Sequence, residues 1–182
     1  NCTGWNNGWC WNIPLYNRIG AGYVYDPALY NSEEEALEDF KAYLDSDRMK
    51  YHDPERSKKI TDYKHIEIKN GVYDRCWTQN VVGVGLSYGF IEPLESTGLA
   101  SMTYGVQELA KQIPQYVYNE EAIASYNMSM MNWYSDAVDF VGSHYADTEW
   151  DTKFWNYVKE MHVKSEKHLW YEEWLRVLLQ QS

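Results

Sequence analysis

The sequence predicts an α+β fold in which strands and hairpins come first and helices follow. Two sets of side chains alternate in Trp9–Tyr16, one of them apolar and largely aromatic, and this two-residue period is typical of strands. A short apolar run broken by glycines, Val81–Leu86, is typical of a buried strand that a ligand or another backbone approaches closely. Beyond Leu99, apolar residues recur every three or four positions, which is the period of a helix.

The first predicted element is a strand with one aromatic face. Trp9, Trp11 and Ile13 alternate with Cys10, Asn12 and their neighbours, and Pro14 indicates the end of the strand or a sheet edge. A turn then leads to a return strand at 23–25. Large aromatic side chains at this spacing most often pack in a core, so the spacing alone favours a structural role for both tryptophans.

A helix is predicted next. Ser32 and Glu35 have the spacing of a capping box, in which each side chain accepts from the backbone N–H of the other residue. The residues from Ala36 to Leu44 then supply an apolar helix face. The polar and charged stretch 45–57 is predicted to be a surface loop.

A hairpin is predicted before the central strand. The dipeptide Asn70-Gly71 separates two strand-like runs, at 65–68 and 72–73. Asn-Gly between such runs is a strong signal for a tight hairpin turn. We therefore expect these two runs to pair with each other and to lead into the central strand.

A turn and the start of a helix follow the central strand. Ser96 and Thr97 are good N-cap types, and Gly98 leaves the backbone accessible. Free N–H groups at a helix start, together with the helix dipole, favour an anion. Glu95 stands directly before them, and two interpretations are open: it only caps the helix, or it is a functional acid beside an anion site.

The last part of the chain is predicted to be helical, with helices at Glu120–Tyr145, Asp151–Met161 and His168–Leu179. The aromatic face of the last one is either a subunit contact in a homo-oligomer or packed on its own domain. We divide the chain into hairpins with one helix at 1–79, a strand–turn–helix segment at 80–112 and a helical region at 113–182.

Charge and cysteine content exclude several classes of function. The 182 residues carry a net charge of −11 and no basic stripe, which argues against nucleic acid as a partner. No window of about 18 apolar residues predicts a membrane span. The three cysteines form no CxxC pair and the five histidines have no metal-ligand spacing, so we expect no metal. Free thiols are typical of a reducing compartment, so we expect a cytoplasmic protein.

Two motifs carry a resemblance to a known family. Residues 85–98 read GLSYGFIEPLESTG and residues 8–14 read GWCWNIP. Both resemble, in the same order, the motifs of flavin-dependent halogenases of the tryptophan-halogenase type. The resemblance implies a flavin-monooxygenase-like fold of two modules, with this chain as the substrate-side and helical C-terminal part. The family's GxGxxG motif and catalytic lysine would lie upstream, so we expect a fragment of a longer protein.

The resemblance also implies the reaction. In this family reduced FAD, O2 and a halide ion generate hypohalous acid, which substitutes an electron-rich aromatic such as an indole, phenol or pyrrole. A flavin reductase supplies FADH2 by diffusion. The halide could be chloride, bromide or iodide. Two alternatives are a related flavin monooxygenase that uses no halide, and a non-catalytic fragment that lacks the FAD-binding half.

Site residues follow from the same motifs. Glu95 matches the catalytic carboxylate, and the backbone at Thr97 and Gly98 matches the halide site. The residues expected along the passage between flavin and substrate are Trp9, Trp11, Ile13, Pro14 and Ser96. Phe154 and Trp155 match the substrate pocket. Trp150 stands about where tryptophan halogenases have a glutamate that binds the amino acid, with Glu149 adjacent, so another indole, a phenol or a carrier-bound group stays open as the substrate beside free tryptophan.

Overall fold

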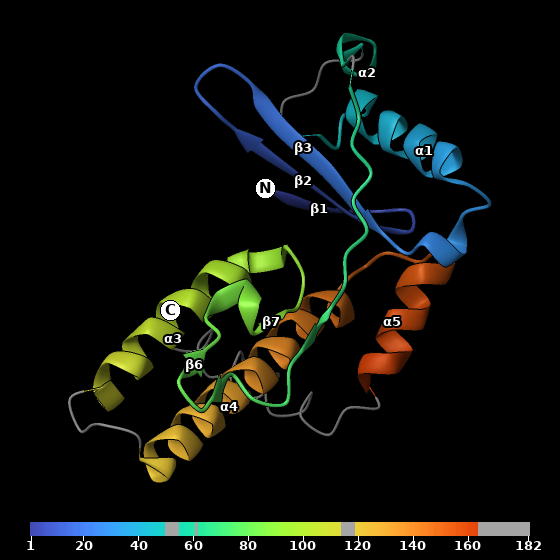
Figure 1. Cartoon of the computed structure of the whole chain (residues 1–182). Coiled ribbons are helices and arrows are strands. Elements are labelled where there is room, and N and C mark those ends of the chain that lie inside the picture. Colours follow the sequence, from blue (N-terminus) through green and yellow to red (C-terminus); the bar gives the residue numbers. More distant parts are fainter. Residues whose placement is uncertain (50–54, 61, 114–118, 164–182) are drawn as a thin grey trace, which may run out of the picture. The chain divides into compact units, whose positions relative to one another are not determined.

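The computed structural model describes residues 1–49, 55–60, 62–113 and 119–163. These residues form two compact units, one made of Asn1–Ile66 with 144–163 and the other of Glu67–Ser143 (Figure 1). The predicted helix at His168–Leu179 lies outside the described residues. The prediction of an α+β fold is confirmed, because both units combine helices with antiparallel strands.

The first unit is built on a three-stranded antiparallel sheet in the order β1-β2-β3. The strands are β1 (Cys2–Trp5), β2 (Gly8–Pro14) and β3 (Ile19–Tyr25). The predicted aromatic strand is therefore confirmed, and Pro14 is its last residue. Because β2 lies in the middle, its register with both neighbours fixes which side chains share a face.

Helix α1 (Glu33–Asp45) covers one face of this sheet, as Figure 1 shows. It begins as predicted, since the Ser32 hydroxyl accepts from the N–H of Glu35. The Glu35 carboxylate accepts from the N–H of Asn31 and not of Ser32, so the capping box is only half formed. Tyr43 and Leu44 pack on the buried Cys10 of β2, and this cluster is the core of the unit.

Three shorter helices complete the first unit. A 3-10 helix, η1 (Pro27–Leu29), follows β3, and its N-cap Asp26 accepts from the N–H of Ala28. Helix α2 (Arg56–Lys59) lies partly in the stretch 45–57 that was predicted to be a loop, so the prediction is wrong at its end. Helix α5 (Lys153–Val163) confirms the predicted helix at Asp151–Met161.

The expectation that the aromatic face of β2 packs in a core is only partly correct. Cys10 and Asn12, on the opposite face, are the fully buried residues beneath α1. On the aromatic face Trp9 is buried, but Trp11 is half-buried and Ile13 is 51% exposed. The reason is that α1 covers the face with the smaller side chains, so the tryptophan face does not form the core of this sheet.

The second unit begins with short strands that do not follow the predicted hairpin. Strand β4 (Gly71–Val72) pairs with β7 (Gly89–Phe90), and β5 (Trp77–Thr78) pairs with β6 (Val81–Val82). The run at 65–68 forms no strand. The predicted hairpin is therefore wrong, and Gly71 with its φ of 146° starts a strand whose partner comes later in the chain.

The predicted buried strand at Val81–Leu86 is also wrong. Strand β6 ends at Val82, and a 3-10 helix, η2 (Gly85–Ser87), follows. The chain turns here because Gly85 has a φ of 61° and because Ser87 exchanges hydrogen bonds with the backbone of Val84. Leu86 is consequently exposed rather than buried.

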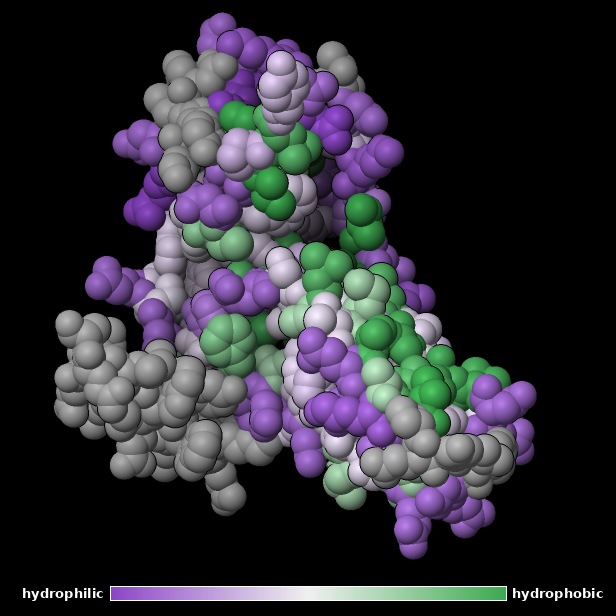
Figure 2. All heavy atoms as spheres, turned by 90° about the vertical axis from the view of Figure 1, so that its left-hand side faces the viewer, coloured by the Kyte–Doolittle hydropathy of each residue, from purple (hydrophilic) through white to green (hydrophobic). Residues whose placement is uncertain are grey.

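Two long helices complete the second unit: α3 (Thr97–Gln112) and α4 (Glu120–Ala146), of which residues 144–146 belong to the first unit. Both were predicted, but the buried face of α3 was not. Its buried side is formed by the small residues Ser101 and Gly105, since Gly105 lets Tyr126 and Met130 of α4 approach its backbone. The apolar stripe that predicted the helix is exposed, at Leu99, Met102, Val106 and Ile113, and Figure 2 shows apolar side chains gathered on this unit.

Candidate functional site

The predicted catalytic turn is a compact loop in the second unit. Its side chains alternate between inside and outside, because Glu92, Leu94 and Thr97 are buried while Glu95 and Ser96 are exposed. The Thr97 hydroxyl donates to the backbone oxygen of Glu92 at 3.1 Å and closes the loop. The loop therefore presents Glu95 and Ser96 outward from a buried base.

Two consecutive residues of this turn have left-handed backbone conformations. Glu95 has φ 57° and ψ 18°, and Ser96 has φ 55° and ψ 31°, at the end of a 3-10 helix, η3 (Leu94–Ser96). Residues other than glycine adopt this region rarely, at a cost of about 1–3 kcal/mol each, and such strain gathers at functional sites. The rest of the loop must therefore hold Glu95 in place.

The start of α3 can receive an anion. Ser96 occupies the N-cap position, yet its side chain makes no capping hydrogen bond, and the Thr97 hydroxyl is turned to Glu92. The prediction that these two side chains cap the helix is therefore wrong. The Ser96 side chain makes no bond to the first N–H groups of α3, and a Cβ at Gly98 would meet no atom within 4 Å. N–H groups at a helix start beside open space suit an anion.

The aromatic residues of the first unit form a second cluster. The Trp9 indole N–H donates to the Tyr145 hydroxyl at 2.8 Å, over 136 positions of sequence. The Tyr145 ring lies 6.2 Å from that of Phe154 and 5.7 Å from that of Trp155, between ring centroids. Trp155 is buried, and its indole N–H donates to the backbone oxygen of Trp5 at 2.6 Å. Trp9 and the two predicted pocket residues thus share one aromatic wall.

Trp11 lies flat across the neighbouring strand. A Cβ at Gly22 would come within 2.5 Å of the Trp11 ring, and one at Gly20 would lie 3.4 Å from it. The glycines of β3 therefore give the ring its space. Ile13 and Pro14 continue the same strand and are exposed.

The predicted site residues fall into two groups, one in each unit. The structure brings Trp9 together with Phe154 and Trp155 in the first unit, through Tyr145. It brings Glu95 to Gly98 together in the second unit, on one turn. Tyr145 was missed as a member of the wall, because nothing in the sequence links it to a tryptophan so far away.

Trp150 has a structural setting in the first unit. Its ring lies where a Cβ of Gly4 would be, 2.4 Å from Nε1, and packs edge-on against Trp5 at 6.2 Å. The guanidinium of Arg48 lies 4.6 Å from the ring centroid, and Lys159 donates to the backbone oxygen of Trp150 at 2.7 Å. These contacts hold the ring as packing on β1.

Within the part of the chain that the structure describes, no three His, Cys, Asp or Glu side chains gather around a point where a metal ion could bind. Burial raises the pKa of the Cys76 thiol to about 11, and its Sγ lies 3.0 Å from Oδ1 of Asn127. A thiol with a raised pKa is a poor nucleophile. Among the described helices, none is both long enough and apolar enough to cross a membrane.

The family model described as "Tryptophan halogenase" matches residues 1–175. Among curated relatives, the tryptophan 6-halogenase SttH of Streptomyces toxytricini is 34% identical over 153 residues, which is 84% of this chain and 27% of that protein. The tryptophan 7-halogenase RebH of Lentzea aerocolonigenes is 33% identical over 158 residues, which is 86% of this chain and 28% of that protein.

The comparison with solved structures also finds halogenases. The flavin-dependent halogenase BrvH from Brevundimonas sp. BAL3 is 30% identical with a TM-score of 0.76, and the match covers 92% of this chain and 32% of that one. A structure named VirX1 is 38% identical with a TM-score of 0.73, over 86% of this chain and 28% of that one.

The fold of this chain is similar to part of the flavin-dependent halogenase BrvH. The chain belongs to the tryptophan halogenase family. It spans little more than a quarter of the length of the curated relatives it matches.

Proposed function

We propose that the protein is an FAD-dependent halogenase that installs chloride, bromide or iodide on an electron-rich aromatic substrate, and that this chain supplies its substrate side. The observation that carries the proposal is the left-handed turn at Glu95 and Ser96 directly before the start of α3, where the Ser96 side chain makes no capping hydrogen bond. It places an outward carboxylate next to backbone N–H groups that suit a halide.

The turn offers backbone N–H groups as donors. It therefore fits a halide better than a larger anion that would need side-chain donors. The Thr97 hydroxyl is committed to Glu92, so binding falls to the backbone N–H groups of Thr97 and Gly98. The open space at Gly98 admits the ion. Bound reduced FAD would supply, with O2, the oxidising power that converts halide to hypohalous acid. The GxGxxG motif of the ADP site is not among these 182 residues, so this chain would contribute only the halide side.

Glu95 would act on the substrate. An outward carboxylate held by a strained turn can orient the electrophilic halogen and take the proton that the aromatic ring releases on substitution. Trp9, Trp11, Ile13, Pro14 and Ser96 would line the passage for hypohalous acid. The apolar side chains of this lining, those of Trp9, Trp11, Ile13 and Pro14, would help to exclude bulk water from the passage.

The aromatic wall of the first unit supports an aromatic substrate. Phe154 is half-buried beside Tyr145 and Trp155, and such rings stack favourably with an indole or a phenol. Trp150 offers no carboxylate and its ring is packed on Gly4. We therefore favour an indole, phenol or carrier-bound group over free tryptophan, with a flavin reductase as the source of FADH2.

The test is a halogenation assay of the full-length protein with reduced FAD, O2, an aromatic substrate and either bromide or chloride. The proposal expects halogenated product that requires the halide. We expect Glu95→Gln to lower kcat by about 10²–10⁴-fold, the usual contribution of a positioned acid–base group. Exposed Glu121 on α4 gives the matched control, since Glu121→Gln removes the same charge.

The alternatives predict other results. A flavin monooxygenase without halide use would give hydroxylated product that does not depend on bromide. A non-catalytic fragment that lacks the FAD-binding half would bind no FAD and give neither product. Either result would contradict the proposal.

A further inference from the structure

The carboxylate of Asp39 on α1 collects four side-chain donors. Its Oδ1 accepts from the indole N–H of Trp5 at 2.9 Å and from the amide of Asn6 at 2.7 Å. Its Oδ2 accepts from the hydroxyl of Tyr23 at 3.2 Å and from the hydroxyl of Tyr30. An ionised carboxylate is the side chain that fits this arrangement, because it can accept about four hydrogen bonds and donates none.

The two tyrosines are dependable donors at neutral pH. Burial is the largest cause that raises the pKa of both the Tyr23 and the Tyr30 hydroxyl. The hydrogen bond to Asp39 raises the pKa of Tyr30 further. The two hydroxyl oxygens also lie 2.7 Å apart, and because each hydroxyl has one hydrogen and Tyr30 donates to Asp39, Tyr23 shares its hydrogen between Tyr30 and Asp39.

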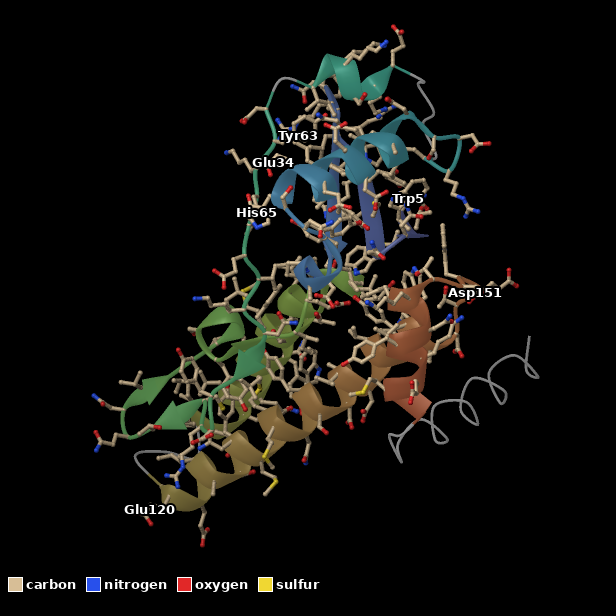
Figure 3. The ribbon with its side chains drawn as sticks, turned by 90° about the vertical axis from the view of Figure 1, so that its right-hand side faces the viewer. Trp5, Glu34, Tyr63, His65, Glu120 and Asp151 are labelled. Carbon is tan, nitrogen blue, oxygen red and sulfur yellow. The ribbon has the colours of Figure 1, made fainter. Side chains whose placement is uncertain are left out.

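Trp5 and Asn6, whose side chains donate to Asp39, also form hydrogen bonds with residues at the start of α5. Trp5 is the last residue of β1 and Asn6 begins the turn to β2, and Figure 3 shows Trp5 next to α1. The backbone oxygen of Trp5 accepts from the indole N–H of Trp155 at 2.6 Å. The backbone oxygen of Asn6 accepts from the hydroxyl of Thr152 at 2.7 Å. Trp5 and Asn6 therefore form hydrogen bonds with α1 through their side chains and with the start of α5 through their backbone carbonyl groups.

We propose that Asp39 is a positioning residue, which fixes the Trp5–Asn6 turn and through it the orientation of Trp155 and Phe154 at the start of α5. The inference deepens the proposed function, because it rests on Trp155 and Phe154 lining the aromatic substrate site. Asp39 touches neither residue, so it acts only through the turn.

The contacts distinguish positioning of α5 by Asp39 from a role in which Asp39 only stabilises the packing of α1 on the sheet. Helix α1 already packs on the sheet through Tyr43 and Leu44, which are fully buried. Helix α5 reaches the turn through two carbonyl groups of the residues that Asp39 holds. Removing the negative charge should therefore loosen α5 more than α1.

The decisive variant is Asp39→Asn, which keeps the size of the side chain but puts an NH2 group where two of the four donors point. Glu38→Gln is the matched control, because Glu38 is the neighbouring acid on α1 and its exposed carboxylate pairs only with Lys41 among the ion pairs described. Both variants lose one negative charge from the same helix.

Hydrogen exchange of the full-length protein tests positioning without any need for turnover. In Asp39→Asn we expect the amides of α5 to exchange about tenfold faster, the effect of weakening one or two hydrogen bonds to a charged acceptor, with α4 unchanged. In a Trp155→Phe background, which removes the bond to Trp5, we expect Asp39→Asn to add little. Unchanged α5 exchange, or equal acceleration in α1 and α5, overturns the inference.

Kinetics then connect positioning with substrate. We expect Asp39→Asn to raise KM for the aromatic substrate about tenfold with kcat within about twofold, and Glu38→Gln to change neither, since a misplaced wall weakens binding more than chemistry. A loss of kcat without a change in KM contradicts the inference. Should the wild-type protein halogenate nothing, the proposed function fails, and the exchange experiment still decides whether Asp39 positions α5.

Discussion

The indole N–H of Trp9 and the hydroxyl of Tyr145 lie 2.8 Å apart and join β2 to the C-terminal end of α4. Trp9 is only 4% exposed, so water has little access to its N–H if the partner is lost. We expect Tyr145→Phe to lower the free energy of unfolding by about 1–3 kcal/mol, the cost of a buried donor without a partner. Urea unfolding of the two proteins measures the difference.

Tyr157 on α5 provides the control for this prediction. It is 57% exposed, so Tyr157→Phe should change the free energy of unfolding by less than about 0.5 kcal/mol. Equal losses in both variants would mean that the bond between Trp9 and Tyr145 contributes nothing specific.

The strained turn gives a second prediction. Because Ser96 has a φ of 55°, Ser96→Gly should relieve strain and raise the free energy of unfolding by about 0.5–1 kcal/mol. The same change makes the turn more flexible, so halogenation should fall about three- to tenfold, as expected when a catalytic group is held less accurately. Thermal unfolding and the halogenation assay together measure both effects.

Gln79 is the matched control, since its φ of 53° is also left-handed and it lies outside the catalytic turn. Gln79→Gly should raise stability by a similar amount and leave halogenation unchanged. Higher activity in Ser96→Gly than in the wild type would refute the view that the strain serves to hold Glu95.

The sequence predicts the long elements of this fold because their periodicity extends over many residues. Strand β2 and helices α1, α4 and α5 all lie where the pattern indicates. The two-residue strands could not be predicted in the same way. Strand β4 takes its partner from Gly89–Phe90, a choice set by tertiary packing, and the local Asn70-Gly71 signal favoured the wrong neighbour.

The buried face of α3 shows a different limit. Its apolar stripe predicted the side that packs, but Ser101 and Gly105 face the core instead, because Tyr126 needs a small residue opposite it. For the candidate site, the structure has the predicted turn at a helix start at 95–98, while the roles of Glu95 and Gly98 stay predictions. The left-handed backbone of Glu95 has no signal in the sequence, since residues other than glycine seldom adopt it.

A third prediction concerns the space beneath Trp11. A methyl group at Gly22 would lie 2.5 Å from the Trp11 ring, closer than any normal contact, so Gly22→Ala must displace that ring. We expect it to lower the free energy of unfolding by about 1–3 kcal/mol, the usual cost of overpacking. In Gly20→Ala the corresponding distance is 3.4 Å, so that variant should lose less than half as much. Similar losses would contradict the placement of the ring over Gly22.

The last prediction concerns alkaline pH. The Tyr126 hydroxyl donates to the backbone oxygen of Gly105 at 3.2 Å, and burial raises its pKa from 10.0 to about 12. Below pH 10 the tyrosine keeps its proton in the folded and the unfolded state. Between pH 10 and about 12 the unfolded state loses the proton and the folded state keeps it, so the free energy of unfolding falls as pH rises.

Each pH unit in this window should cost up to about 1.4 kcal/mol from Tyr126. Tyr126→Phe has no proton to lose, so it should be less stable than the wild type at pH 7 by about 1 kcal/mol, the value of one hydrogen bond, and lose less stability in alkali. Urea unfolding at several pH values, with Tyr16→Phe at an exposed position as the control, measures both slopes. Parallel slopes for Tyr126→Phe and the wild type would exclude Tyr126 as the group whose proton links folding to pH.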